Sequence, residues 1–408
     1  MTHEHQTPSE GSVPLPRGFL AGAVRAGIRP DIDKLDVGIL FSQVSCTAAA
    51  VYTSNRVKAA PLLVCQERLA DGRAQAVVAN SGCANAATGE QGLADARRMA
   101  ELAAAKLGIR PSDVLVASTG VIGTLLPMER VRDGVSRLEL SAAGGADFAR
   151  AIMTTDTRPK CAGGQCGRQG KEYSLWAVAK GAGMIHPNMA TMLCFIATDA
   201  PLAQPYLAAC LREAVDASFN MIDVDSDTST NDTVIVLANG SAGGDPIDSG
   251  HPASATFRSA LTDCCIHLAK AIVADAEGAT KVIECAVQGG ASPADARKAA
   301  REVVRSLAVK TAVYGCDPNW GRILAAVGNS GAAMSEEKAV ITISAPGNGG
   351  VCVYRGAPLP FDAAQARACL ASREVNIRVE LGLSDGSATA WGSDITEEYV
   401  RLNSAYTT

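Results

Sequence analysis

The chain has 408 residues, of which 47% are hydrophobic and 19% charged, and its formal net charge is −5. This balance is typical of an ordered globular protein with two sizeable cores, and it excludes a largely disordered chain. No segment gathers Lys and Arg as a nucleic-acid-binding surface requires, so we expect no nucleic-acid partner.

Residues 1–12 are polar and lack the basic start and apolar stretch of a secretory signal, so they are expected to form a tail. No run of about eighteen apolar residues predicts a membrane span. The 13 cysteines are odd in number, and several lie in apolar runs, which is typical of buried thiols in a reducing compartment. Their spacing matches no zinc site. We therefore expect a cytoplasmic protein with no metal and no membrane partner.

Short apolar runs alternate with helix-like stretches along the chain, which indicates an α/β class. Buried strands are predicted at residues 76–80, 113–117, 175–179, 192–198 and 233–238. Helices are predicted at residues 91–107 and 255–276, where apolar residues recur at helical spacing. Past about residue 282 the pattern restarts with strands at 281–287, 339–344 and 375–381 and a helix that follows a cap at Ser292. This restart predicts a second, smaller α/β domain.

The stretch from Lys180 to Leu193, Lys-Gly-Ala-Gly-Met-Ile-His-Pro-Asn-Met-Ala-Thr-Met-Leu, interrupts two of these strands. Its glycines and proline prevent the first strand from continuing, and a buried strand resumes just after Thr191. This junction suits a strained peptide bond whose carbonyl the Thr191 hydroxyl attacks. On spacing alone, an ordinary glycine-rich loop remains the alternative.

Attack by the Thr191 hydroxyl would move the acyl group of Ala190 from nitrogen to oxygen, and water would then split the ester. Thr191 would become a chain end whose α-amine has an ordinary pKa of about 7.7–8.0, so a fraction of it is a neutral base near pH 7. Such a nucleophile needs no histidine, and the chain has only 5.

This stretch resembles the cleavage segment of the ornithine acetyltransferase family, also called glutamate N-acetyltransferase or arginine biosynthesis bifunctional protein. The resemblance extends from about Pro16 to Thr408. It implies autocatalytic scission between Ala190 and Thr191, in a layered α/β fold shared with the self-cleaving aminopeptidase DmpA. Residues 1–190 would form the α chain, 191–282 would complete the catalytic domain, and 283–408 would form the smaller C-terminal domain. Two copies of each cleaved chain would form a heterotetramer.

The turn Ala117-Ser-Thr-Gly-Val-Ile-Gly123 lacks the Lys-Ser or Lys-Thr pair that a phosphate loop needs. From the residues alone, it is either an ordinary turn between a strand and a helix or a turn that stabilises an oxyanion. The resemblance assigns oxyanion stabilisation to Thr119 and Gly120, with Thr191 as the catalytic nucleophile. It also implies substrate binding by five further residues, which are Thr154, Lys180, Glu277, Asn403 and Thr408. From the residues alone, Thr154 would belong to a capping turn and Lys180 to the surface. Glu277 would end a helix, where an acid is unfavourable.

The implied reaction transfers acetyl from N-acetylornithine to glutamate through an acetyl-threonine ester, without metal or organic cofactor. The sequence leaves open whether acetyl-CoA is also a donor, and an N-terminal-nucleophile aminopeptidase or amidase is the rival class.

Residues 223–227 have the acids of a calcium loop but lack its glycine and its glutamate. Residues 227–232 form a hydroxyl-rich turn with no assigned role, and the segment 315–321 likewise carries no readable chemistry.

Overall fold

The structure, a computed structural model, describes residues 13–168, 171–186 and 192–405. It contains two sheets, which confirms the predicted α/β class. The larger sheet has eight strands in the order β4-β3-β2-β9-β7-β6-β5, with β1 beside β2. Its strands are β1 (Phe19–Val24), β2 (Val37–Tyr52), β3 (Arg73–Asn80), β4 (Val114–Ser118), β5 (Lys160–Arg168), β6 (Lys171–Lys180), β7 (Leu193–Thr198) and β9 (Thr233–Ala238).

Strand β2 joins two layers of this sheet because its two halves have different partners. Its first half pairs with β1 and β3, its second half pairs with β9, and the register shifts between Phe41 and Cys46. Side chains from both layers, among them Val78 of β3 and Phe195 of β7, share one apolar core. Strands β4, β7 and β9 are buried along their whole length, which explains their continuous apolar sequences.

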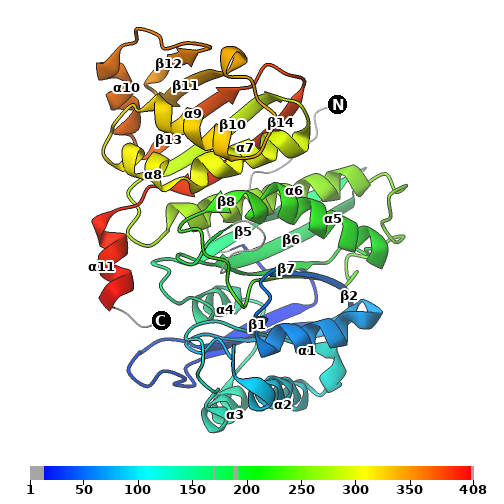
Figure 1. Cartoon of the computed structure of the whole chain (residues 1–408). Helices are drawn as coiled ribbons and strands as arrows, with labels where there is room; N and C mark the ends of the chain where they lie inside the picture. The colour runs from blue at the N-terminus through cyan, green and yellow to red at the C-terminus, as the bar shows by residue number, and fades with distance from the viewer. Residues whose placement is uncertain (1–12, 169–170, 187–191, 406–408) are drawn as a thin grey trace.

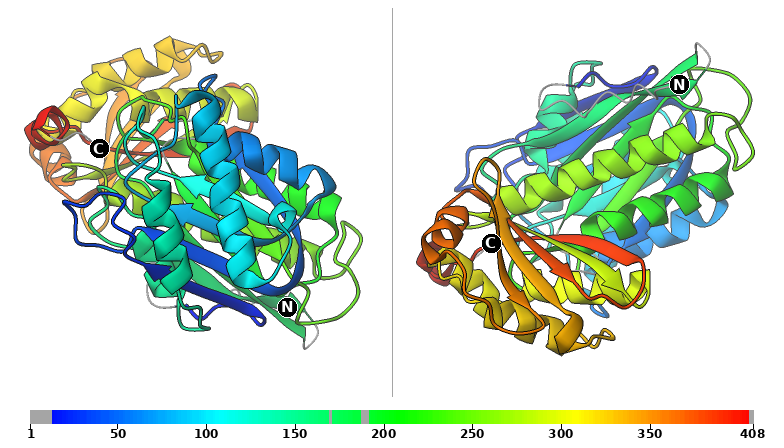
Figure 2. Two further views of the ribbon diagram at one scale, coloured as in Figure 1. Left: turned by 90° about the horizontal axis from the view of Figure 1, so that it is seen from below. Right: turned by 90° about the horizontal axis from the view of Figure 1, so that it is seen from above.

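Helices cover both outer faces of these layers (Figures 1 and 2). On the first layer lie α1 (Ala60–Arg68), α2 (Gly89–Leu107), α3 (Met128–Arg137) and α4 (Gly145–Ala151). On the other side α5 (Gln204–Ala217) and α6 (Ser254–Ala274) pack against each other, and α6 covers β5 and β6. Helices therefore enclose the two strand layers.

The smaller sheet has the order β12-β11-β13-β10-β14-β8. Its strands are β8 (Ile222–Asp223), β10 (Val282–Gly290), β11 (Val340–Ala345), β12 (Gly349–Arg355), β13 (Glu374–Glu380) and β14 (Gly386–Ser393). Its helices are α7 (Pro293–Arg305), α8 (Leu307–Tyr314), α9 (Trp320–Asn329) and α10 (Ala363–Leu370), and α11 (Glu397–Ala405) follows the last strand. One apolar core continues from α5 and α6 into this sheet.

The predicted strands and helices are confirmed, with ends that differ by a few residues. The helix predicted from residue 255 ends at Ala274, and α7 begins after Ser292, whose hydroxyl accepts a hydrogen bond from the Asp295 amide. The division of the chain at residues 190 and 282 stays a prediction. No helix in the described parts of the chain has the length and apolarity to cross a bilayer.

Candidate active site

The turn after β4 requires glycine at its second position. Gly120 has a φ of 129°, and a Cβ there would lie 2.4 Å from the Gly82 carbonyl carbon and 2.6 Å from the Cys83 nitrogen. Any side chain would therefore push the turn away from the segment beside it. The neighbouring Thr119 is 3% exposed.

Two buried asparagines, Asn80 and Asn231, bond to this turn. The Thr119 amide donates to the Asn80 carbonyl at 3.0 Å, and the Ser118 hydroxyl donates to Asn80 Oδ1 at 2.6 Å. Asn231 Nδ2 donates to the carbonyls of Ser118 at 2.8 Å and Ala84 at 2.6 Å. Neither asparagine was predicted as a site residue, although Asn231 lies in the hydroxyl-rich stretch without an assigned role. Their bonds rigidify the turn, as a preorganised oxyanion site requires.

Lys180, the last residue of β6, is a buried cation and not the surface lysine that its residue type alone suggests. Its side chain is 2% exposed, and its ammonium donates to Thr154 Oγ1 at 2.7 Å. Burial lowers the pKa of Lys180, while the Asp156 carboxylate, 3.9 Å away, opposes that shift. The predicted Thr154 and Lys180 are thus in direct contact.

Asp156 organises this part of the site. Its carboxylate accepts hydrogen bonds from the amides of Thr154 at 3.0 Å and Gly181 at 2.7 Å and from Lys160 Nζ at 2.7 Å. Lys160 also bonds Asp275 at 2.6 Å, so it links Asp156 to the segment that carries Glu277. Burial would raise the pKa of Asp156, but Lys180 and Lys160 outweigh burial and hold this pKa below its ordinary value. The sequence did not reveal this network, because Lys160 and Asp275 are 115 positions apart.

Asp156→Asn is expected to lower the free energy of unfolding by about 3–5 kcal/mol, because it leaves the buried Lys180 ammonium without its carboxylate partner and Lys160 with Asp275 alone. Chemical denaturation measures this change. Asp147→Asn is the matched control, because Asp147 pairs with Arg150 at the surface, where the cost is about 0–1 kcal/mol. A loss at Asp156 no larger than in the control would contradict the role given to the buried network.

Glu277 lies in a turn beyond α6, which ends at Ala274, so it does not oppose the helix dipole as the sequence suggested. Its amide donates to the Ala182 carbonyl at 3.0 Å, and its Oε2 accepts from Asn403 Nδ2 of α11 at 2.9 Å. A Cβ at Gly183 would lie 2.4 Å from Glu277 Oε2, so the carboxylate packs directly on this glycine. The carboxylate and α11 therefore meet at the glycine turn after β6.

Several of these residues line a cavity of about 280 Å³, near the lower end of the range for small-molecule sites. Its lining residues are Ala84, Thr119, Gly120, Val121, Ile122, Thr154, Thr155, Lys180, Gly183, Met184, Ser229, Thr230, Asn231, Glu277 and Asn403. The structure thus brings six predicted site residues to one cavity, with a cation and an acid among them. Ala190, Thr191 and Thr408 lie outside the described residues.

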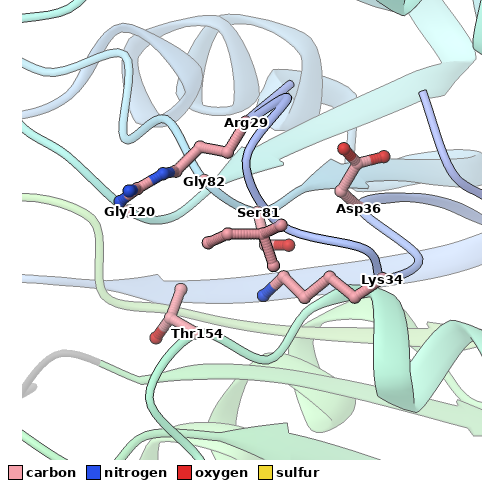
Figure 3. A pocket seen from close by; sticks show the side chains of 8 residues that line it. Arg29, Lys34, Asp36, Ser81, Gly82, Gly120 and Thr154 are labelled. Carbon is pink, nitrogen blue, oxygen red and sulfur yellow. The ribbon is translucent and has the colours of Figure 1, made fainter. Parts of the chain in front are cut away.

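A smaller cavity of about 20 Å³ adjoins the first, since both include Gly120 and Thr154 (Figure 3). In Figure 3 the Lys34 ammonium extends toward Thr154, whereas the Asp36 carboxyl points away from it. Asp36 accepts hydrogen bonds from the backbone amides of residues 26–28. Burial and the charge of Lys180 both lower the pKa of Lys34. The Lys34 ammonium donates to the carbonyl of Met153, the residue before Thr154, at 2.5 Å.

The acids Asp223 and Asp225 of residues 223–227 bond to segments that are distant from them in the sequence. Asp223 pairs with Lys310 at 3.2 Å and with His186 at 2.8 Å, and Asp225 accepts from the amides of Met184 and Ile185. Among the described residues, no group of three or more His, Cys, Asp or Glu side chains is arranged to hold a metal ion.

The fold and the cavity together define a layered α/β protein with a charged, polar small-molecule site. The model of the ArgJ family matches residues 20–408. The arginine biosynthesis bifunctional protein ArgJ of Symbiobacterium thermophilum is 51% identical over 402 residues, 98% of this chain and 99% of that protein. The protein of the same name from Bacillus subtilis is 44% identical over 400 residues, 98% of this chain and 97% of that protein. The chain belongs to the ArgJ family, which confirms the resemblance predicted from the cleavage segment.

Two solved structures are also similar to this chain. The arginine biosynthesis bifunctional protein ArgJ of Bacillus halodurans is 41% identical with a TM-score of 0.43, over 45% of this chain and 97% of that chain. The ornithine acetyltransferase of Mycobacterium tuberculosis, solved in complex with ornithine, is 40% identical with a TM-score of 0.40, over 42% of this chain and 92% of that chain.

Proposed function

We propose that this chain is a glutamate N-acetyltransferase of arginine biosynthesis, which moves the acetyl group of N-acetylornithine to glutamate. Family membership over nearly the whole chain supports this proposal. The main observation behind the proposal is that six predicted site residues line the same cavity. These residues are Thr119, Gly120, Thr154, Lys180, Glu277 and Asn403. A cavity with a buried ammonium and a carboxylate suits substrates that carry both an amine and a carboxylate.

In the proposed mechanism, Thr191 Oγ attacks the acetyl carbonyl of N-acetylornithine, and its own α-amine accepts the hydroxyl proton. Thr119 and Gly120 stabilise the negative charge that develops on the carbonyl oxygen. Ornithine leaves with a proton on its amine, and the acetyl group stays on Thr191 as an ester. The α-amine of glutamate then attacks the ester, which yields N-acetylglutamate and restores the Thr191 hydroxyl. Lys180 would hold a substrate carboxylate, and Glu277 with Asn403 would hold the ornithine amine.

This mechanism requires a free amine on Thr191, so the proposal includes self-cleavage between Ala190 and Thr191. We further propose that two copies of each product chain assemble in the cytoplasm, that Thr408 completes the substrate site, and that no metal or organic cofactor takes part. Denaturing electrophoresis of the purified protein would then show two chains of about half the full length, and native mass spectrometry would show two copies of each.

Transfer of an acetyl label tests the reaction. The protein is incubated with N-acetylornithine labelled in its acetyl group, together with glutamate, and the products are separated by chromatography. We expect the label in N-acetylglutamate. Label only in free acetate would overturn the transferase proposal in favour of a hydrolase, because water and not an amine would then have taken the acetyl group. Labelled acetyl-CoA in place of N-acetylornithine tests the second donor.

A further inference from the structure

Helix α11 lies at the outside of the molecule but supplies one residue of the cavity, Asn403 (Figure 1). None of its 9 residues is fully buried. An isolated helix of this length is marginal in water, so contacts outside the helix must hold it in place. Within α11, Tyr399 and Leu402 are partly buried, and residues three or four apart share a helix face. The face that carries Tyr399, Leu402 and Asn403 is therefore the one that contacts the rest of the protein.

Tyr399 ties this face to the glycine turn after β6. Its phenol donates to Asp225 Oδ2 at 3.2 Å, and the same carboxylate accepts from the amides of Met184 at 2.6 Å and Ile185 at 2.8 Å. Burial and the Asp225 charge raise the pKa of Tyr399, so the phenol keeps its proton. Burial raises the pKa of Asp225 to about 6, so this group is mainly an ionised acceptor above neutral pH. One carboxylate thus joins α11 to the wall of the cavity.

Asn403 reaches the cavity from the next turn of α11. Its Nδ2 donates to the Tyr399 carbonyl at 3.1 Å and to Glu277 Oε2 at 2.9 Å. Both protons of this amide are therefore used, one on the helix and one on the carboxylate. The place of the Asn403 side chain, and with it the alignment of Glu277, follows the place of Tyr399.

Tyr399 itself is not among the described residues that line the cavity. Nor is it among those that line a neighbouring cavity of about 260 Å³, which shares Thr155, Glu277 and Asn403 with the first. Tyr399 is thus placed to affect a bound molecule through its neighbours and not by contact.

The two substrates of the proposed reaction differ in what they present to Glu277. The α-amine of N-acetylornithine carries the acetyl group, so the free positive charge of this substrate is on its side-chain amine. The side chain of glutamate ends in a carboxylate instead. A fixed carboxylate attracts the first side chain and repels the second.

We propose that Tyr399 is a positioning residue for N-acetylornithine. Through Asn403 it aligns the Glu277 carboxylate with the side-chain amine of this substrate, and it has no such role when glutamate is bound. The inference rests on the proposed function, in which Glu277 and Asn403 hold that amine.

Tyr399→Phe removes the phenol oxygen and retains the ring. We expect kcat/KM for N-acetylornithine to fall about 10-fold, the scale of one hydrogen bond to a charged group, mainly through a higher KM. The value for glutamate should change less than about 2-fold, because the acetyl-threonine ester separates the two half-reactions. Tyr206→Phe is the matched control. Tyr206 is also partly buried and donates to one acceptor, the Ser254 carbonyl at 2.6 Å, but it is not among the described residues of either cavity.

Asn403→Ala tests the route of the effect. If Tyr399 acts through Asn403, Tyr399→Phe should change kcat/KM for N-acetylornithine less than about 2-fold when Asn403 is already alanine, because coupled residues are not additive. The full loss in that background would overturn the inference, since Tyr399 would then act by another path.

Hydrogen–deuterium exchange of residues 397–405 reports on α11 without any substrate. We expect faster exchange in Tyr399→Phe than in the wild type, and no change in Tyr206→Phe. Unchanged exchange, equal losses for both substrates, unchanged kinetics, or an unfolding midpoint far below that of Tyr206→Phe would each overturn the inference. The proposed function survives these results as long as the wild-type protein transfers the label to N-acetylglutamate. A wild-type protein that transfers none would overturn both.

Discussion

Thr191→Ala is expected to leave one uncut chain and to reduce acetyl transfer by at least about 10³-fold, the scale of losses when a catalytic nucleophile is removed. The physical reason is that one hydroxyl would serve both reactions. Without it, no oxygen attacks the Ala190 carbonyl, no new amine forms, and no ester can hold the acetyl group. Gel electrophoresis, intact mass and the label assay measure the two effects together.

Thr191→Ser is the control for this prediction, because serine retains the hydroxyl and loses only a methyl group. We expect this variant to be cut at the same bond and to retain part of its transferase activity. Two chains from Thr191→Ala, with the second beginning at residue 191, would exclude the threonine from the scission mechanism. A single uncut chain that still transfers acetyl at the wild-type rate would exclude it from the transfer.

Thr119→Val is expected to lower kcat for acetyl transfer by about 10²- to 10³-fold with little change in KM, because an oxyanion donor acts mainly in the transition state. Valine has nearly the shape of threonine, and the backbone amide of residue 119 would still donate to the Asn80 carbonyl. The turn should therefore keep its conformation while the hydroxyl is lost. Steady-state kinetics on the cleaved protein measures both constants.

Thr119→Ser should restore most of the activity, since it returns the hydroxyl to the same turn. Thr262→Val is the remote control, because the Thr262 hydroxyl bonds only to the preceding turn of α6 at the surface. If Thr119→Val raised KM and left kcat unchanged, the hydroxyl would bind substrate and transition state equally, and its role as an oxyanion donor would be wrong.

The sequence predicted the position of strands that are buried on both faces. Residues 76–80, 192–198 and 233–238 are continuous apolar runs, and all three are strands within the larger sheet. Strand β2 was missed, because Cys46 to Ala50 has little local strand preference and the residues near its bend are exposed. Its conformation depends on pairing with β1, β3 and β9, which are distant in the sequence.

The sequence by itself determined the α/β class, the family and six of the residues that line the cavity, because these depend on apolar periodicity and on long specific motifs. Only the tertiary structure decided which charges face one another. Lys160 lies between the carboxylates of Asp156 and Asp275. The Asn231 side chain donates to the Ser118 carbonyl, and the Asp232 carboxyl group accepts from the Met192 amide. Separate strands and loops bring these groups together. Local preference carries no information on such pairs, since their energies arise from burial and proximity that exist only after the layers have packed.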